Sequence, residues 1–248
     1  LYNHIKYLEV ENNFVICEDN WWGEASLGSY YAFVLYEGTE VLYDGNYVDG
    51  IKTLKDVALY DAYLSAEIVN YTNNIWKNNI CFAEDKTNNT LLKSKGGGKK
   101  PLIRNYLNNK FIVEEAFAER LGQSKDNLKV DFISLTQYAK SYIIDNNIFD
   151  VYDIRFPVSS SMIGSYIFSN NTVKAKKGSG KLAIVRLKDE YSTDKIEILN
   201  NNIEIDERTV EPFTLVCVID YREISSDIID RVVINNNRIT APFGYLFY

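Results

Sequence analysis

The chain has 248 residues and a net charge of −7, and 46% of its residues are hydrophobic, 25% charged and 14% aromatic. This composition is typical of a folded globular protein and excludes both a disordered tail and a general DNA-coating protein. No apolar run is long enough for a membrane helix, so we expect a cytoplasmic protein that does not enter a membrane. Three cysteines, each within an apolar run, are expected to be reduced core thiols: Cys17, Cys81 and Cys217.

The first 85 residues are expected to form strands around one helix. Residues 13–17 and 79–83 are apolar runs typical of strands, and residues 29–36 and 39–43 predict a hairpin around Glu37-Gly38. Between them, Val57, Leu64, Ile68 and Tyr71 follow helical spacing, which predicts a helix over residues 54–71.

After residue 85, helices and a strand are expected to alternate once more, and the rest of the chain is expected to be rich in strands. A basic glycine-rich loop over residues 93–104 precedes a predicted helix at 111–121, a strand at 128–135 and a helix at 138–149. Short strands are then expected at residues 182–187, 195–199, 213–220 and 231–234 and at the aromatic terminus "PFGYLFY". We therefore divide the chain into domains 1–153 and 154–248, and we find no internal repeat of fixed period.

Carboxylates follow two of the apolar runs and interrupt the predicted helix. "VICED" ends at Asp19 and "ICFAED" at Asp85, whereas Asp61 shares a helical face with Val57 and Leu64. An ionised carboxylate inside an apolar stripe must be hydrogen-bonded, protonated, paired with a cationic side chain or bound to a metal. Oxygen ligands without histidine or cysteine favour Mg²⁺ or Mn²⁺.

The order of these segments resembles the ribonuclease H-like superfamily. "VICED" matches its first strand, "GSYYAFVLYEGTEVLYDG" its hairpin, "KDVALYDAYLSAEI" its first helix and "ICFAED" its fourth strand. The resemblance implies an α/β fold, with a mixed sheet and flanking helices followed by a smaller β-rich domain. It also implies a metal-dependent nuclease that hydrolyses RNA, an RNA/DNA hybrid or another nucleic acid. Two Mg²⁺ or Mn²⁺ ions would be held by the catalytic residues Asp19, Asp61, Asp85 and Asp145, with Asp150 or Asp153 as substitutes for the last.

Two basic segments are candidates for contact with nucleic acid. Lysine and arginine on a glycine-rich backbone suit phosphate groups, and the same residues also occur in ordinary solvated loops. One segment is "KAKKGSGK" at residues 174–181, which lacks the leading glycine and the serine or threonine of a phosphate-binding loop. The other supplies the predicted substrate-binding residues Lys93, Lys95, Lys99, Lys100 and Arg104.

A second hypothesis has the same fold without the activity. In it, the chain is a catalytically inactive ribonuclease H-like binding or assembly module from a phage, a virus or a bacterium. Alanine at Asp19 separates the two, because it abolishes Mg²⁺-dependent cleavage only in the nuclease. The sequence carries no signal for the oligomeric state.

Overall fold

The computed structural model describes seventeen stretches of the chain. Apart from Ala116, which is helical, their regular structure is entirely β-strand. The described residues are 5–16, 33–35, 38–50, 52–53, 59–61, 67–81, 89–94, 102–114, 116, 130–135, 139–151, 163–175, 183–188, 193–205, 213–219, 229–241 and 244–247.

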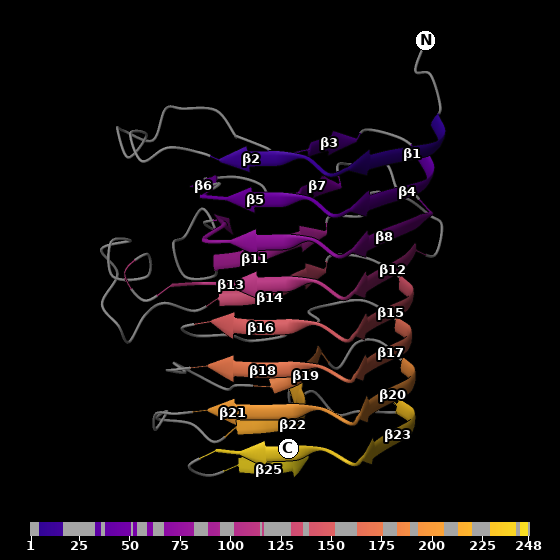
Figure 1. The fold of residues 1–248 in the computed structure, drawn as a ribbon. Helices are drawn as coiled ribbons and strands as arrows, with labels where there is room; N and C mark the ends of the chain where they lie inside the picture. Colours follow the sequence, from indigo (N-terminus) through magenta and orange to yellow (C-terminus); the bar gives the residue numbers. More distant parts are fainter. Residues whose placement is uncertain are drawn as a thin grey trace.

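Two parallel sheets of eight strands run the length of the molecule (Figure 1). Sheet A contains, in spatial order, β1 (Ile5–Glu11), β4 (Gly38–Asp44), β8 (Ile68–Thr72), β12 (Leu102–Leu107), β15 (Ala139–Asp145), β17 (Ile163–Ser169), β20 (Thr193–Leu199) and β23 (Ile229–Asn235). Sheet B contains β2 (Phe14–Ile16), β5 (Tyr47–Asp49), β9 (Ile75–Lys77), β13 (Lys110–Ile112), β16 (Ile148–Val151), β18 (Thr172–Ala175), β21 (Asn202–Ile205) and β24 (Arg238–Thr240).

Strand order in both sheets follows chain order, so each pass of the chain stacks on the previous one. One pass, called a coil below, consists of a strand of sheet A, a two-residue corner and the next strand of sheet B. Tyr43 pairs with Tyr71 in sheet A, and Val48 pairs with Trp76 in sheet B, so both registers advance together. This arrangement is a parallel β-helix of eight coils, a solenoid in which each coil packs on its neighbours.

The remaining strands form two further sheets. Sheet C contains β3 (Phe33–Leu35), β7 (Leu59–Asp61), β11 (Asn89–Ser94), β10 (Ile80–Cys81) and β6 (Lys52–Thr53), with β14 (Val130–Leu135) paired to β11. Sheet D contains β19 (Ala183–Lys188), β22 (Phe213–Ile219) and β25 (Gly244–Phe247). β10 and β11 form the one antiparallel pair among the described strands.

The corner between sheets A and B has the same backbone conformation in every coil. Its first residue has a positive φ, between 54° and 62°, which is the left-handed region that asparagine and glycine tolerate best. Asparagine fills this position except in the second coil, where Gly45 stands; a Cβ there would lie 2.6 Å from Asn12 Oδ1. The corner residues are Asn12, Gly45, Asn73, Asn108, Asn146, Asn170, Asn200 and Asn236.

The second corner residue is asparagine in all eight coils, and these side chains form a continuous asparagine ladder. The Asn109 side chain donates to the Tyr71 carbonyl oxygen (2.8 Å) and accepts from the Asn74 backbone N–H (3.0 Å). The same pattern repeats along the stack and satisfies backbone groups that the turn would otherwise leave unpaired. The ladder comprises Asn13, Asn46, Asn74, Asn109, Asn147, Asn171, Asn201 and Asn237.

Side chains of equivalent position stack inside the coils and form the core. Tyr71 lies between Tyr43 and Tyr106, with ring centroids 5.3 Å and 4.8 Å away and nearly parallel planes. On the sheet B side, Phe111 and Phe149 stack at 5.0 Å. All five are at most 2% exposed, so aromatic stacking adds to apolar burial as a force that holds the coils together.

The ribonuclease H-like fold expected from the sequence is wrong, because the structure has parallel sheets and almost no helix. The predicted helix at 54–71 contains β7 and β8, and burial in β8 alternates with a period of two. The helix predicted at 138–149 is two strands, β15 and β16, separated by the corner Asn146-Asn147. The helix predicted at 111–121 begins inside β13, and only Ala116 of its described part is helical.

The predicted hairpin is also wrong, since β3 and β4 belong to different sheets and pair with β7 and β1. The division near residue 153 stays a prediction. Both long sheets continue across it, because β15 pairs with β17 and β16 pairs with β18.

Candidate functional site

The four acids predicted to bind metal do not form one described cluster. Asp19 and Asp85 lie outside the described residues. Asp61 ends β7 in sheet C, beside Leu35 and Ser94, whereas Asp145 ends β15 in the fifth coil of sheet A. The structure therefore does not bring Asp61 and Asp145 together. Within the described stretches, no group of three or more His, Cys, Asp or Glu side chains is arranged to hold a metal ion.

Asp145 takes part in hydrogen bonds that link two coils. Its Oδ1 accepts from Ser169 Oγ (2.6 Å) and from Asn170 Nδ2 (2.7 Å), both in the next coil. Asp44 does the same three coils earlier, with Thr72 Oγ1 (2.6 Å) and Asn73 Nδ2 (2.7 Å). The recurrence of one geometry at two corners indicates a structural role for Asp145, as an acceptor that fixes the corner of the following coil.

The predicted basic residues do not form one described cluster either. Lys93 lies in β11, whereas Lys95, Lys99 and Lys100 lie outside the described residues. Arg104 lies in β12 and is 0% exposed, with Nη1 donating to the Ile103 carbonyl oxygen (3.1 Å). Its guanidinium therefore points into the coil and is not on the surface. In the second basic segment, Lys174 is exposed on β18 and residues 176–181 are not described.

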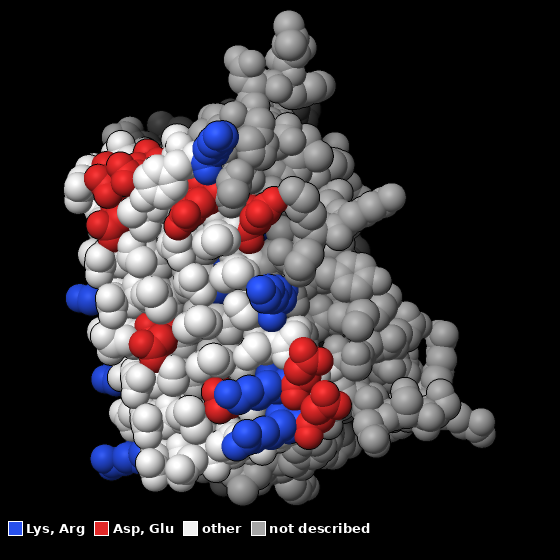
Figure 2. All heavy atoms as spheres, turned by 90° about the vertical axis from the view of Figure 1, so that its right-hand side faces the viewer, with Lys and Arg blue, Asp and Glu red and all other residues white. Residues whose placement is uncertain are grey.

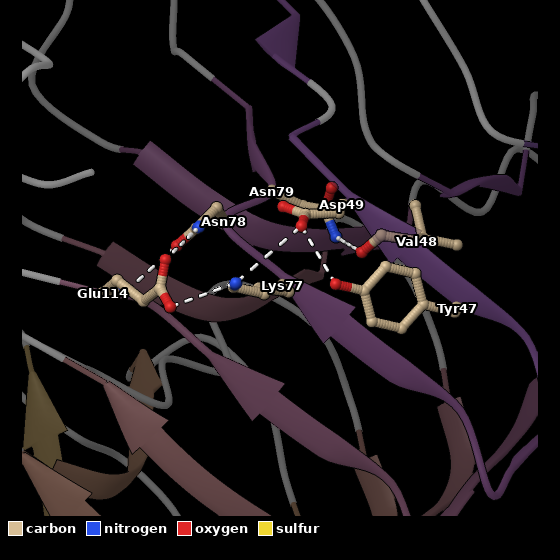
Figure 3. A network of polar contacts seen from close by, with 7 residues as sticks. All are labelled: Tyr47, Val48, Asp49, Lys77, Asn78, Asn79 and Glu114. Carbon is tan, nitrogen blue, oxygen red and sulfur yellow. Dashed lines mark hydrogen bonds and ion pairs between the residues drawn. The ribbon is translucent and has the colours of Figure 1, made fainter. Parts of the chain in front are cut away.

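A polar network on the outside of sheet B joins the second, third and fourth coils (Figure 3). Lys77 Nζ lies 3.0 Å from Glu114 Oε1 and 4.0 Å from Asp49 Oδ2. Tyr47 donates its hydroxyl hydrogen to Asp49 Oδ2 (3.0 Å), and Asn78 Nδ2 donates to Glu114 Oε2 (2.9 Å). The network therefore places one cation between two carboxylates, next to a phenol.

The ionisation of these groups favours a structural network over a catalytic one. The hydrogen bond to Glu114 raises the pKa of Lys77. Partial burial, followed by the hydrogen bond to Asp49, raises the pKa of Tyr47. Both groups therefore hold their protons more firmly than usual, which is opposite to what a base or nucleophile requires.

The four central strands of sheet A, β8, β12, β15 and β17, carry a band of uncharged side chains at their middle outward positions, although Lys140 is exposed at the start of β15 and Asp145 ends that strand. At the two outward positions near the middle of each strand stand amides, hydroxyls and isoleucines, all partly exposed. Asn105 Nδ2 donates to Asn70 Oδ1 (2.8 Å), which joins two of these amides across adjacent coils. We call this band the neutral face; it consists of Ile68, Asn70, Ile103, Asn105, Ser141, Ile143, Ser165 and Ile167.

Charged side chains gather near both ends of this surface in Figure 2, and a few also lie at mid-height. The first two coils carry Glu9 and Glu40 at the equivalent positions. The last two carry Lys195, Glu197 and Arg231, of which the first two form an ion pair at 2.8 Å. The neutral face is therefore a bounded surface about 14 Å long, given three strand spacings of about 4.8 Å.

The sequence does contain the signal for the corners, although it is easily missed. An asparagine pair, or Gly-Asn, follows each sheet A strand, as in "NYTNNIWK", "NYLNNKFI" and "IIDNNIFD". Successive ladder asparagines are between 24 and 38 residues apart because the segments that connect the coils differ in length. A search for a fixed period therefore does not detect a repeat that recurs eight times.

Comparison of the chain with protein-family models, with curated proteins and with solved structures found no match. Within the described residues, no helix has the length and apolar character needed to span a membrane.

Proposed function

We propose that this chain is a non-catalytic binding module whose neutral face binds an extended, uncharged ligand. The observation that carries the proposal is the neutral face itself, a set of eight partly exposed residues without formal charge on a chain with a net charge of −7. The coils beneath it are fixed by two ladders of strands and by the asparagine ladder. A ligand that binds there meets a surface that is already ordered, so little conformational entropy is lost on binding.

The chemistry of the neutral face suits an uncharged oligosaccharide. Ser141 and Ser165 can donate and accept hydrogen bonds, as sugar hydroxyls require, whereas the Asn70 and Asn105 amides are hydrogen-bonded to each other and Asn105 Oδ1 is buried. Ile143 and Ile167 offer apolar surface for the C–H side of a sugar ring. The eight residues of the face carry no charge, and the charges around it are of both signs: Glu9 and Glu40 lie at one end, Lys195 and Arg231 at the other, and Lys140 is exposed beside Ser141.

A charge placed on the neutral face tests this proposal. The variant Ile143→Glu puts a carboxylate at its centre, whereas Ile148→Glu makes the same change in the same coil but on sheet B, where Ile148 is 42% exposed. In binding measurements with a panel of neutral oligosaccharides, we expect Ile143→Glu to weaken binding about tenfold or more and Ile148→Glu to leave it unchanged. The proposal fails if no member of the panel binds the unaltered chain, or if Ile143→Glu binds as tightly as Ile148→Glu.

The hypothesis of a Mg²⁺- or Mn²⁺-dependent nuclease stays a prediction, as does the cytoplasmic location. Asp19 and Asp85, on which the nuclease depends most, lie outside the described residues. Cleavage of RNA, DNA or hybrid substrates that requires a divalent ion and is lost in Asp19→Ala would replace the binding module with the enzyme.

A further inference from the structure

At each end of the β-helix, the terminal strands of sheets A and B have no outer partner among the described strands. Among the described strands, β1 pairs only with β4 and β2 only with β5 at one end, and β23 pairs only with β20 and β24 only with β21 at the other (Figure 1). Edge strands of this kind present unpaired backbone N–H and C=O groups, which can pair with another chain. Each end therefore presents one edge strand of sheet A and one edge strand of sheet B, and all of these strands run in the direction of the parallel sheets.

Inward-facing apolar side chains of the terminal coils are only partly covered. In the first coil, Val10 and Val15 are partly exposed, and in the last coil Ile234 and Ile239 are partly exposed. The equivalent residues one coil further in, Ile198 and Ile203, are 0% exposed. A further coil stacked on either end would bury these side chains as the interior coils bury theirs.

Hydrogen bonding in the asparagine ladder has a direction, so its two ends are complementary. Each asparagine donates its backbone N–H to Oδ1 of the asparagine in the following coil, as Asn201 does to Asn237 (2.9 Å). Asn13 donates to Asn46 in this way, which leaves its own Oδ1 as an acceptor without a described donor. At the other end, the Asn237 backbone N–H has no acceptor among the described residues. The C-terminal end thus offers a donor and the N-terminal end an acceptor.

Exposed side chains at the two ends are also complementary when the register is continued by one coil. Continuation of the sheet A register places Asp230 next to Lys6 of a second copy, because Arg231 and Tyr7 occupy the same column. In sheet B it places Arg238 next to the exposed ring of Phe14 of that copy. Opposite charges on paired strands and a cation over an aromatic ring are both favourable contacts.

We infer that copies of this chain stack head to tail, with the last coil of one copy on the first coil of the next. Sheets A and B and the asparagine ladder then continue across the junction with an unchanged register. A contact between two different surfaces of the same chain does not close on itself when it is repeated by translation along an axis. The product is therefore a linear filament, whose length increases with protein concentration.

A charge exchange at the junction tests this inference on the full chain. Lys6→Asp and Asp230→Lys each place like charges opposite one another, whereas the double variant restores an opposite pair. Both residues are exposed, so the changes leave the coils intact. In sedimentation velocity at low salt, each single variant should weaken association roughly fivefold, and the double variant should return to within about twofold of the unaltered chain. The variant Lys140→Asp, in the equivalent column of an interior coil, should have no effect.

Linear oligomers that lengthen with concentration, weaken in both single variants and recover in the double variant would support stacking. The inference is overturned if the chain stays monomeric at about 1 mM, if it forms only a closed dimer, or if the double variant associates no better than the single ones.

Discussion

At the scale of single residues, asparagine has two different structural roles at the first and second positions of a corner. Asn146 is selected for its backbone, because a positive φ of 54° is strained for most side chains. Asn147 is selected for its side chain, which is 1% exposed and reaches the Tyr106 carbonyl oxygen at 2.8 Å. The amide offers both a donor and an acceptor in a short side chain, and both are needed at every coil of the ladder.

Removal of one ladder amide should destabilise the whole chain. In Asn109→Ala the buried N–H of Asn74 loses its acceptor and the Tyr71 carbonyl oxygen loses a donor. An unsatisfied buried polar group costs about 1–3 kcal/mol, so we expect the free energy of unfolding to fall by about 3 kcal/mol. Equilibrium denaturation in urea measures this change.

The control is Asn105→Ala, in the same coil but on the neutral face, where the side chain is only partly buried and donates to Asn70. Its cost should be about 1 kcal/mol or less. Equal losses in the two variants would contradict the structural role given to the ladder.

At the scale of elements, the network around Lys77 holds three coils in register on the outside of sheet B. Glu114 Oε1 pairs with Lys77, and its Oε2 accepts from Asn78, so one carboxylate of the fourth coil contacts two residues of the third. The two partners of the ion pair are 27% and 50% exposed, so solvent screening limits its contribution to a few tenths of a kcal/mol. Such a network fixes register more than it adds stability.

The contribution of this ion pair should disappear at high pH. Because the folded state raises the pKa of Lys77, the pair stabilises the fold fully below the usual lysine pKa of about 10.4 and loses its effect as the pH rises through the raised value. We expect Glu114→Gln to lower the free energy of unfolding by about 0.5 kcal/mol at pH 8 and by much less at about pH 11.5. Denaturation at the two pH values measures the difference.

Glu204→Gln makes the same change on β21 of sheet B, where Glu204 lies opposite Lys174 in the register but forms no ion pair within 4.0 Å with a described residue, and its effect should be much smaller at both pH values. A loss in Glu114→Gln that is independent of pH would show that the carboxylate acts only through Asn78.

Part of the strand content could be predicted from the sequence, but its arrangement could not. Apolar runs over residues 182–187, 195–199 and 213–220 predicted strands that the structure contains as β19, β20 and β22. In contrast, "YIIDNNIF" is predicted to lie in a helix, whereas the Asn-Asn corner separates two short strands there, β15 and β16. Strands of three to seven residues are too short for periodicity to distinguish the two structures.

The predicted site stays a prediction as a whole, because Asp19 and Asp85 lie outside the described residues, but the fold expected to assemble it is wrong. Asp145 is expected on a helix and instead ends strand β15. The inference that it meets Asp19 and Asp85 depends on a mixed sheet in which distant strands are neighbours. In a β-helix each strand contacts the coil before and the coil after, so residues far apart in sequence are far apart along the axis. The neutral face has no sequence motif. Its residues come from four different coils, and none of them is unusual in its own segment of the sequence.

At the scale of the whole molecule, stability is distributed along an axis. Each coil contributes one strand to sheet A, one to sheet B and one asparagine to the ladder, and its principal partners are the coils on either side. The free energy of such a stack is approximately a sum of coil and interface terms. The spacing between ladder asparagines can therefore vary from 24 to 38 residues without interruption of the stack.

Deletion of one complete coil should therefore be tolerated. Removal of residues 147–170 joins Asn146 directly to Asn171, so that a positive-φ asparagine still precedes a ladder asparagine and β15 still leads into β18. We expect a folded, β-rich chain by circular dichroism, with a cooperative transition at a lower temperature because one interface is lost. Removal of only residues 147–158 takes away β16 without the rest of its coil, and it should abolish the cooperative transition, because the strand that follows enters the wrong sheet. If both deletions behaved alike, the coil would not be the unit of this fold, and the stacking inferred at its ends would lose its physical basis.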